Sequence, residues 1–150
     1  MAEVNSLQAA NAAAGTKNRA ADHNRLRALV VTMAASWTAA NGDTAATKQM
    51  LPPNCRVVQA DVACAAGAAS STLSVGLRDA KDGANPDADA LVNAQSIATA
   101  ANVRNVSGAL MLNGADGLTP DRESEVFLTF GGANPTANQD LRVTIWYIAP

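Results

Sequence analysis

Beyond residue 26 the chain is organised as short stretches in which apolar and polar side chains alternate. A strand turns successive side chains to opposite faces, so this period of two predicts half-buried strands rather than helices. The predicted strands are residues 29–35 (ended by Trp37), 56–64, 70–77, 96–100, 107–112, 125–130 and 141–148.

The alternation also assigns faces within these strands. In 56–64 we expect Val58, Ala60 and Val62 to share one face. In 70–77 we expect the leucines and valine to point inward and the residues between them outward. The inward set is Leu73, Val75 and Leu77, and the outward set is Ser74, Gly76 and Arg78.

Turn-forming residues separate the strands. Clusters rich in Gly, Pro, Asn and Asp occupy residues 41–43, 52–54, 79–85 and 131–135. Pro86-Asp87 can begin a short helix through Leu91 and Val92, with Asp87 as its N-cap. Strands at this spacing predict an all-β protein, an antiparallel β-sandwich or jelly roll of about seven or eight strands with one short helix.

The last predicted strand is apolar on both faces near its end. Tyr147 continues the face of Leu141, Val143 and Ile145, whereas Trp146 lies on the opposite face. A strand that is apolar on both sides is buried within one subunit or at a contact between subunits. We therefore expect Trp146 or Tyr147 to be partly covered by another chain.

The first 25 residues differ from the rest, because Leu7 is the only large aliphatic side chain between Asn5 and Arg25. The sequence predicts an N-terminal arm over residues 1–25 that orders against a neighbour, followed by a β-sandwich domain over 26–150. A frayed terminus is the alternative.

The arm and the residues just after it contain a local group of basic residues, which can contact an acidic protein surface. The lone histidine, His23, is expected to be solvated or interfacial. The group is Lys17, Arg19, Arg25 and Arg27.

Composition narrows the possible functions. The chain has 150 residues, enough for one domain with its own core, and 48% of them are hydrophobic but only 3% aromatic. Alanine supplies much of the hydrophobic fraction, so the chain buries less apolar area than that fraction suggests. A formal net charge of −2 argues against a broad nucleic-acid surface. We expect no secretory signal and no membrane span, because no apolar run approaches 18 residues.

The inventory for chemistry is small, and we expect no catalytic site, cofactor or metal. Cys55 and Cys64 would lie about 30 Å apart along an extended segment, beyond disulfide reach, which favours a reducing compartment. His23 lies in the polar arm, where geometry is poorly held. The acids of 79–89 do not follow a calcium-loop pattern, and those at 116–125 are expected to form an exposed connection with local ion pairs. No phosphate-loop motif is present.

Two segments carry a family resemblance. Residues 57–89, with the run Ala-Ala-Ser-Ser-Thr-Leu-Ser-Val-Gly at 68–76 and Asp-Gly-Ala-Asn-Pro-Asp-Ala at 82–88, resemble small virion proteins of tailed bacteriophages. The ending resembles them as well, from Phe127-Leu128-Thr129-Phe130-Gly131-Gly132-Ala133 into the strand 141–148. The shared motifs are turns and strands, not catalytic signatures.

The resemblance implies a capsid decoration, or cement, protein. Such a protein would be a structural, non-enzymatic component of the virion's outer capsid surface, made in the host cytoplasm, that bridges major capsid protein subunits. It would form a homo-oligomer, a dimer or trimer, with neither nucleic acid nor membrane as a partner. No capsid-contact residue can be carried over from the resemblance. The candidate interface residues come instead from the arm and the last strand, and they are Leu7, Lys17, Arg19, His23, Arg25, Trp146 and Tyr147.

Two alternative functions stay open at this point. One is a carbohydrate- or receptor-binding β-sandwich on a virion, for which Trp37 is the aromatic side chain to test by alanine substitution. The other is a tail or neck component of the phage.

Overall fold

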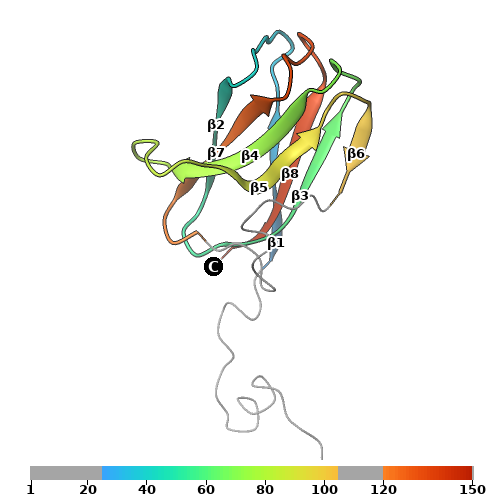
Figure 1. Cartoon of the computed structure of the whole chain (residues 1–150). Helices are drawn as coiled ribbons and strands as arrows, with labels where there is room; N and C mark the ends of the chain where they lie inside the picture. Colours follow the sequence, from blue (N-terminus) through green and yellow to red (C-terminus); the bar gives the residue numbers. More distant parts are fainter. Residues whose placement is uncertain (1–24, 105–119, 150) are drawn as a thin grey trace, which may run out of the picture.

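The structure is a computed structural model that describes residues 25–104 and 120–149, and these residues form eight strands in two four-stranded sheets (Figure 1). Neighbouring strands are antiparallel throughout. The strands are β1 (Leu26–Thr32), β2 (Thr44–Leu51), β3 (Arg56–Cys64), β4 (Thr72–Asp79), β5 (Asp87–Ser96), β6 (Ala101–Val103), β7 (Ser124–Gly131) and β8 (Leu141–Ile148).

The strand pairs are nested around the middle of the chain. β4 pairs with β5, β3 with β6, β2 with β7 and β1 with β8, while β3 also pairs with β8 and β4 with β7. The resulting orders are β1-β8-β3-β6 in one sheet and β2-β7-β4-β5 in the other. This nested eight-stranded arrangement is a jelly roll. The predicted fold class, an all-β antiparallel sandwich, is confirmed.

The core lies between the two sheets and is built mainly from aliphatic side chains at alternate positions. Trp37 joins it by stacking on Phe130 with ring centroids 5.2 Å apart, and its indole Nε1 donates to the carbonyl of Gln139 at 2.9 Å. The largest fully buried side chains are Phe130, Leu51, Leu73, Leu91, Ile97, Leu128, Ile145, Val57, Val62, Val75, Val92 and Val126. The sandwich therefore has a core of its own, despite its alanine-rich composition.

The strands with clear alternation were predicted well. β3 and β8 have the predicted limits, and Leu73, Val75 and Leu77 are buried in β4 as expected. One face assignment in β3 is wrong, because the pairing with β8 shifts register between Val57 and Gln59. That bulge turns Val57 into the core and leaves Val58 half-buried.

Three other local predictions are wrong. Residues 86–92 are not a helix: residues 87–96 form strand β5, with Asp87 paired to Leu77 instead of capping a helix. β2 was not predicted, and the strand expected at 96–100 is a connection that leads to β6 at 101–103. The strand predicted at 107–112 lies outside the described residues.

Glycine decides how closely β5 crosses β4. Gly76, predicted to point outward, is buried, and a Cβ on it would lie 2.7 Å from Ala88 Cα and nearer still to the Asp87 carbonyl oxygen. The pairing of β4 with β5 shifts register on both sides of Val75, and Gly76 lies within the second shift. The absence of a side chain therefore allows the bulged β5 backbone to pack directly on β4.

Candidate functional site

The predicted interface residues fall into three groups. Leu7, Lys17, Arg19 and His23 lie outside the described part of the chain, and Arg25 is exposed just before β1. Trp146 and Tyr147 are both half-buried but on opposite faces of β8. Tyr147 packs against the core, whereas Trp146 lies on the outer face of its sheet. Coverage of either residue by another chain stays a prediction.

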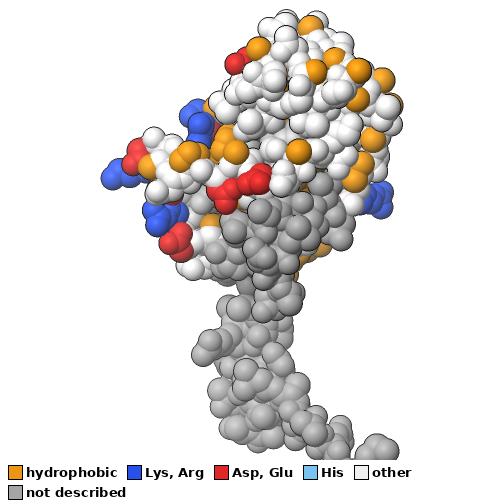
Figure 2. Space-filling view, viewed as in Figure 1, with side chains coloured by type: hydrophobic (Ala, Val, Ile, Leu, Met, Phe, Trp, Pro, Cys, Tyr) orange, Lys and Arg blue, Asp and Glu red, His pale blue; other side chains and the backbone are white. Residues whose placement is uncertain are grey.

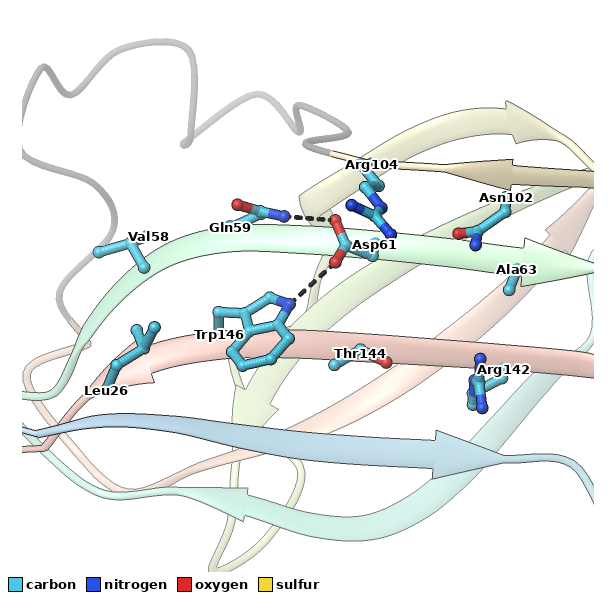
Figure 3. Close-up of a pocket in the computed structure, with 10 residues that line it drawn as sticks. All are labelled: Leu26, Val58, Gln59, Asp61, Ala63, Asn102, Arg104, Arg142, Thr144 and Trp146. Atoms are coloured by element: carbon cyan, nitrogen blue, oxygen red, sulfur yellow. Dashed lines mark hydrogen bonds between the residues drawn. The ribbon is translucent and has the colours of Figure 1, made fainter.

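Trp146 is part of an open groove on the outer face of the β1-β8-β3-β6 sheet (Figure 3). The groove has a volume of about 420 Å³ and receives side chains from all four strands or from residues directly beside them. We call this surface the groove face. It is lined by Leu26, Val58, Gln59, Asp61, Ala63, Asn102, Arg104, Arg142, Thr144 and Trp146.

Strand register brings the central side chains of the groove together. Gln59 pairs with Trp146, and Asp61 pairs with Thr144. The Trp146 Nε1 donates to Asp61 Oδ2 at 2.8 Å, and the Gln59 Nε2 donates to Asp61 Oδ1 at 2.8 Å (Figure 3). The carboxylate thus holds the indole in one orientation, with both of its oxygens acting as acceptors.

The two ends of the groove differ in character. Leu26, Val58 and Trp146 form an apolar end, and Val58 reaches it because of the bulge in β3. Asn102 and Arg142 lie at the other end (Figure 3). In the part of the chain that the structure describes, neither Arg104 nor Arg142 forms an ion pair with a carboxylate.

On the β2-β7-β4-β5 sheet, one acid of the 116–125 segment, Glu125, does not lie in an exposed connection as predicted. Arg122 pairs with its neighbour Asp121 on the surface, as expected for a local ion pair. It also pairs with Asp79 of β4, a distant residue in the sequence that the prediction did not include. Glu125, in contrast, is buried on β7 instead of lying in an exposed connection. No group of three or more His, Cys, Asp and Glu side chains suited to a metal ion occurs within residues 25–104 and 120–149.

Glu125 is held by a bulge and by two cations. Its Oε2 accepts from Arg78 Nε at 2.9 Å, and its Oε1 accepts the backbone N–H of Lys48 at 3.1 Å. Lys48 has a φ of 56° at the point where β2 slips against β7. Burial alone raises the pKa of Glu125, but these hydrogen bonds and the charges of Arg78 and Lys48 outweigh it, so the pKa lies below its ordinary value.

The structure also gives the positions of the two cysteine thiols and of Trp37, the side chain considered for stacking on a sugar ring. Cys55 is buried and Cys64 half-buried, and both are free. Burial raises the pKa of the Cys55 thiol to about 11.

Trp37 is only 8% exposed in the core, so a sugar ring cannot stack on it, and that part of the carbohydrate-binding alternative is wrong. The described residues contain no helix that could cross a membrane.

Most of the groove was missed from sequence. The signal for β3 and β8 was present, since Asp61, Arg142 and Thr144 occupy polar positions of strands that were predicted correctly. Their meeting depends on which strands are neighbours and in which register, and the alternation of one strand contains neither. Asn102 and Arg104 were not considered because β6 was not predicted.

Two chains from solved phage capsids share the fold. One, in the capsid of Ralstonia phage GP4, has a TM-score of 0.64 and 17% sequence identity, over 84% of this chain and 85% of that one. Another, in the capsid asymmetric unit of cyanophage Pam1, has a TM-score of 0.59 and 16% identity, over 85% and 86% of the two chains. No protein-family model and no curated protein sequence matches significantly. The chain therefore has a jelly-roll fold that is also found in components of phage capsids.

Proposed function

We propose that this protein is a structural component of a bacteriophage virion that decorates the capsid and bridges major capsid protein subunits. The observation that carries the proposal is the similarity of fold, over 84% of this chain, to a chain in the capsid of Ralstonia phage GP4. The proposed role needs binding surfaces and no reaction. Open polar and apolar surface, such as the groove face, is consistent with that role.

Bridging would stabilise the shell through multivalency. Once one contact to a capsid subunit has formed, a second contact by the same protein or its oligomer is effectively intramolecular, so weak patches give high avidity. A dimer or trimer on the outer surface would supply several equivalent contacts. The free thiols of Cys55 and Cys64 agree with synthesis in the reducing host cytoplasm.

Copy number per particle tests the proposal directly. Purified virions would be analysed by quantitative mass spectrometry, with the major capsid protein as the internal standard. Decoration of a repeating shell requires a copy number on the order of hundreds, whereas a cyclic tail or neck ring would contain about six or twelve. Absence from washed particles would refute a virion role, and a ring-like number would replace decoration by the tail or neck alternative.

The N-terminal arm is proposed as a second point of attachment. Its basic residues and Leu7 are the groups it offers to a neighbour. Deletion of residues 1–24 should lower capsid occupancy while the thermal unfolding of the β-sandwich stays close to that of the full chain, because buried side chains between Leu29 and Ile145 already form a core between the two sheets. Occupancy equal to that of the full chain, measured by cosedimentation with particles, would remove the arm from the proposal.

A further inference from the structure

The two sheets of the sandwich differ strongly in charge. Among the described residues, five arginines lie on or near the β1-β8-β3-β6 sheet with only two acids, whereas the other sheet and its loops have eight acids and four basic residues. The first group is Arg25, Arg27, Arg56, Arg104, Arg142, Asp61 and Asp140. The second is Asp43, Asp79, Asp82, Asp87, Asp89, Asp121, Glu123, Glu125, Lys48, Arg78, Lys81 and Arg122.

Local pairing sharpens this difference. On the acidic sheet, three of the four basic residues, Arg78, Lys48 and Arg122, are within ion-pair distance of carboxylates. Figure 2 shows acidic and basic side chains close together on one side of the molecule. On the groove face, Arg104 and Arg142 have no such partner among the described residues. Their guanidinium groups are exposed and available to carboxylates of another molecule.

The two large hydrophobic side chains that are exposed in the described residues lie on the outward side of β1, at the groove face. Leu26 is 57% exposed and Val30 is 47% exposed, and these are the large hydrophobic side chains that the sandwich leaves in solvent. Both belong to β1, which pairs with β8 without a bulge. Leu26 lines the apolar end of the groove, and Val30 follows four residues later on the same side of β1, where it also borders a second hollow beside β2. Exposed apolar patches of this kind mark contact sites.

The groove is long enough for an extended contact. Trp146 and Arg142 are four residues apart on β8, which places the apolar end about 13 Å from the cationic end. The hydrogen bond to Asp61 fixes the indole before any partner arrives, which lowers the entropic cost of binding. Tryptophan and arginine are the side chains most enriched at the energetic centres of protein interfaces.

We propose that the groove face is the surface by which this protein binds the shell, and that the partner is an acidic protein surface presenting a large apolar side chain to the Trp146 end. Arg104 and Arg142, which have no carboxylate partner among the described residues, favour an acidic partner, and the apolar end of the groove beside Leu26 and Trp146 favours an apolar side chain. A bound saccharide would fill the groove but leave Val30 exposed, so the extent of the apolar surface favours a protein. This inference rests on the proposed virion role.

The test uses particles of the phage that encodes the protein, purified from a strain lacking its gene. Full-length protein is added back, and binding is measured by cosedimentation over a range of protein and salt concentrations. The variants are Arg142→Glu and Trp146→Ala, and the matched control is Lys81→Glu, a charge reversal at an exposed position in the loop between β4 and β5. Thermal unfolding checks that each variant is folded.

Arg142→Glu should weaken binding by at least about tenfold and flatten its salt dependence, because it places a like charge opposite an acidic partner. Trp146→Ala should weaken it by a similar or larger factor, whereas Lys81→Glu should bind like the wild type. Since Arg142 is exposed, its result does not depend on a variant that unfolds.

Four results would overturn the inference. Wild-type binding by both Arg142→Glu and Trp146→Ala would exclude the groove face while leaving the virion role intact. If the variants keep full occupancy on particles but lose binding to polygalacturonate, the groove face binds an acidic saccharide. If they keep full occupancy but change their oligomeric state in sedimentation, the groove face binds a second copy of this chain. No binding by the wild type itself would instead remove the virion role, and with it this inference.

Discussion

The buried ion pair of Glu125 gives the sharpest prediction of stability. The Glu125 side chain is 4% exposed, and Arg78, whose side chain is 23% exposed, donates to its Oε2. Glu125→Gln keeps the side-chain volume but replaces one carboxylate oxygen by an NH2 group, which cannot accept a hydrogen bond. Either Arg78 or the backbone N–H of Lys48 therefore loses its acceptor. The negative charge opposite the Arg78 guanidinium is lost as well.

The expected destabilisation is about 2–3 kcal/mol at pH 7, from one lost hydrogen bond to a charged group plus the donor left without a partner. Partial exposure of Arg78 keeps the value at the lower end of the range for broken buried pairs. For a chain of this size that loss corresponds to a decrease in Tm of about 5–10 °C. Urea unfolding followed by circular dichroism measures it.

The dependence on pH has a definite sign. Because the pKa of Glu125 is lower in the folded state, its contribution to stability is fully present above the pKa of the unfolded chain and is lost as pH falls through the folded-state pKa. The gap between wild type and Glu125→Gln should therefore be largest near neutral pH and should narrow below about pH 4.

Glu123→Gln is the matched control, since Glu123 is exposed two residues away in the sequence, and its effect should stay within about 0.5 kcal/mol. A Glu125→Gln effect as small as the control, or a gap that does not change between pH 7 and pH 3, would refute this account of Glu125.

Two further predictions concern the close packing of β5 and the thiols. Gly76→Ala should lower the free energy of unfolding by about 1–3 kcal/mol in urea melts, because the new methyl group overlaps the backbone at Ala88; unchanged stability would contradict that packing. In Ellman's assay at pH 8, Cys64 should react first and Cys55 only on unfolding, since burial raises the pKa of Cys55 to about 11; equal rates in the single Cys→Ser variants would contradict this.

Particular strands show where sequence was sufficient. β8 alternates large apolar and polar residues from Leu141 to Ile145, so its inward face could be predicted. β5 buries Ala90, Leu91 and Val92 in succession, because register shifts against β4 interrupt its pleat. The short apolar run from Ala90 to Val92, after the helix-start signal Pro86-Asp87, does not distinguish a helix from a strand, and the pairing with β4 makes it a strand.

β2 was missed for a different reason. It has few large apolar residues, and its pairing with β7 is interrupted at Lys48 by the bulge that Glu125 stabilises. A strand of this kind is specified by its neighbour more than by its own sequence.

The sequence by itself determined that this protein is an all-β sandwich, because side-chain alternation is a local property that reports which face of each strand is buried. Tertiary structure alone decided the nested strand order, the groove around Trp146 and Asp61, and the separation of charge between the two sheets. Those features join residues as far apart as Leu26, Asp61 and Trp146, and their meeting depends on strand pairing across the whole chain, which no local pattern encodes.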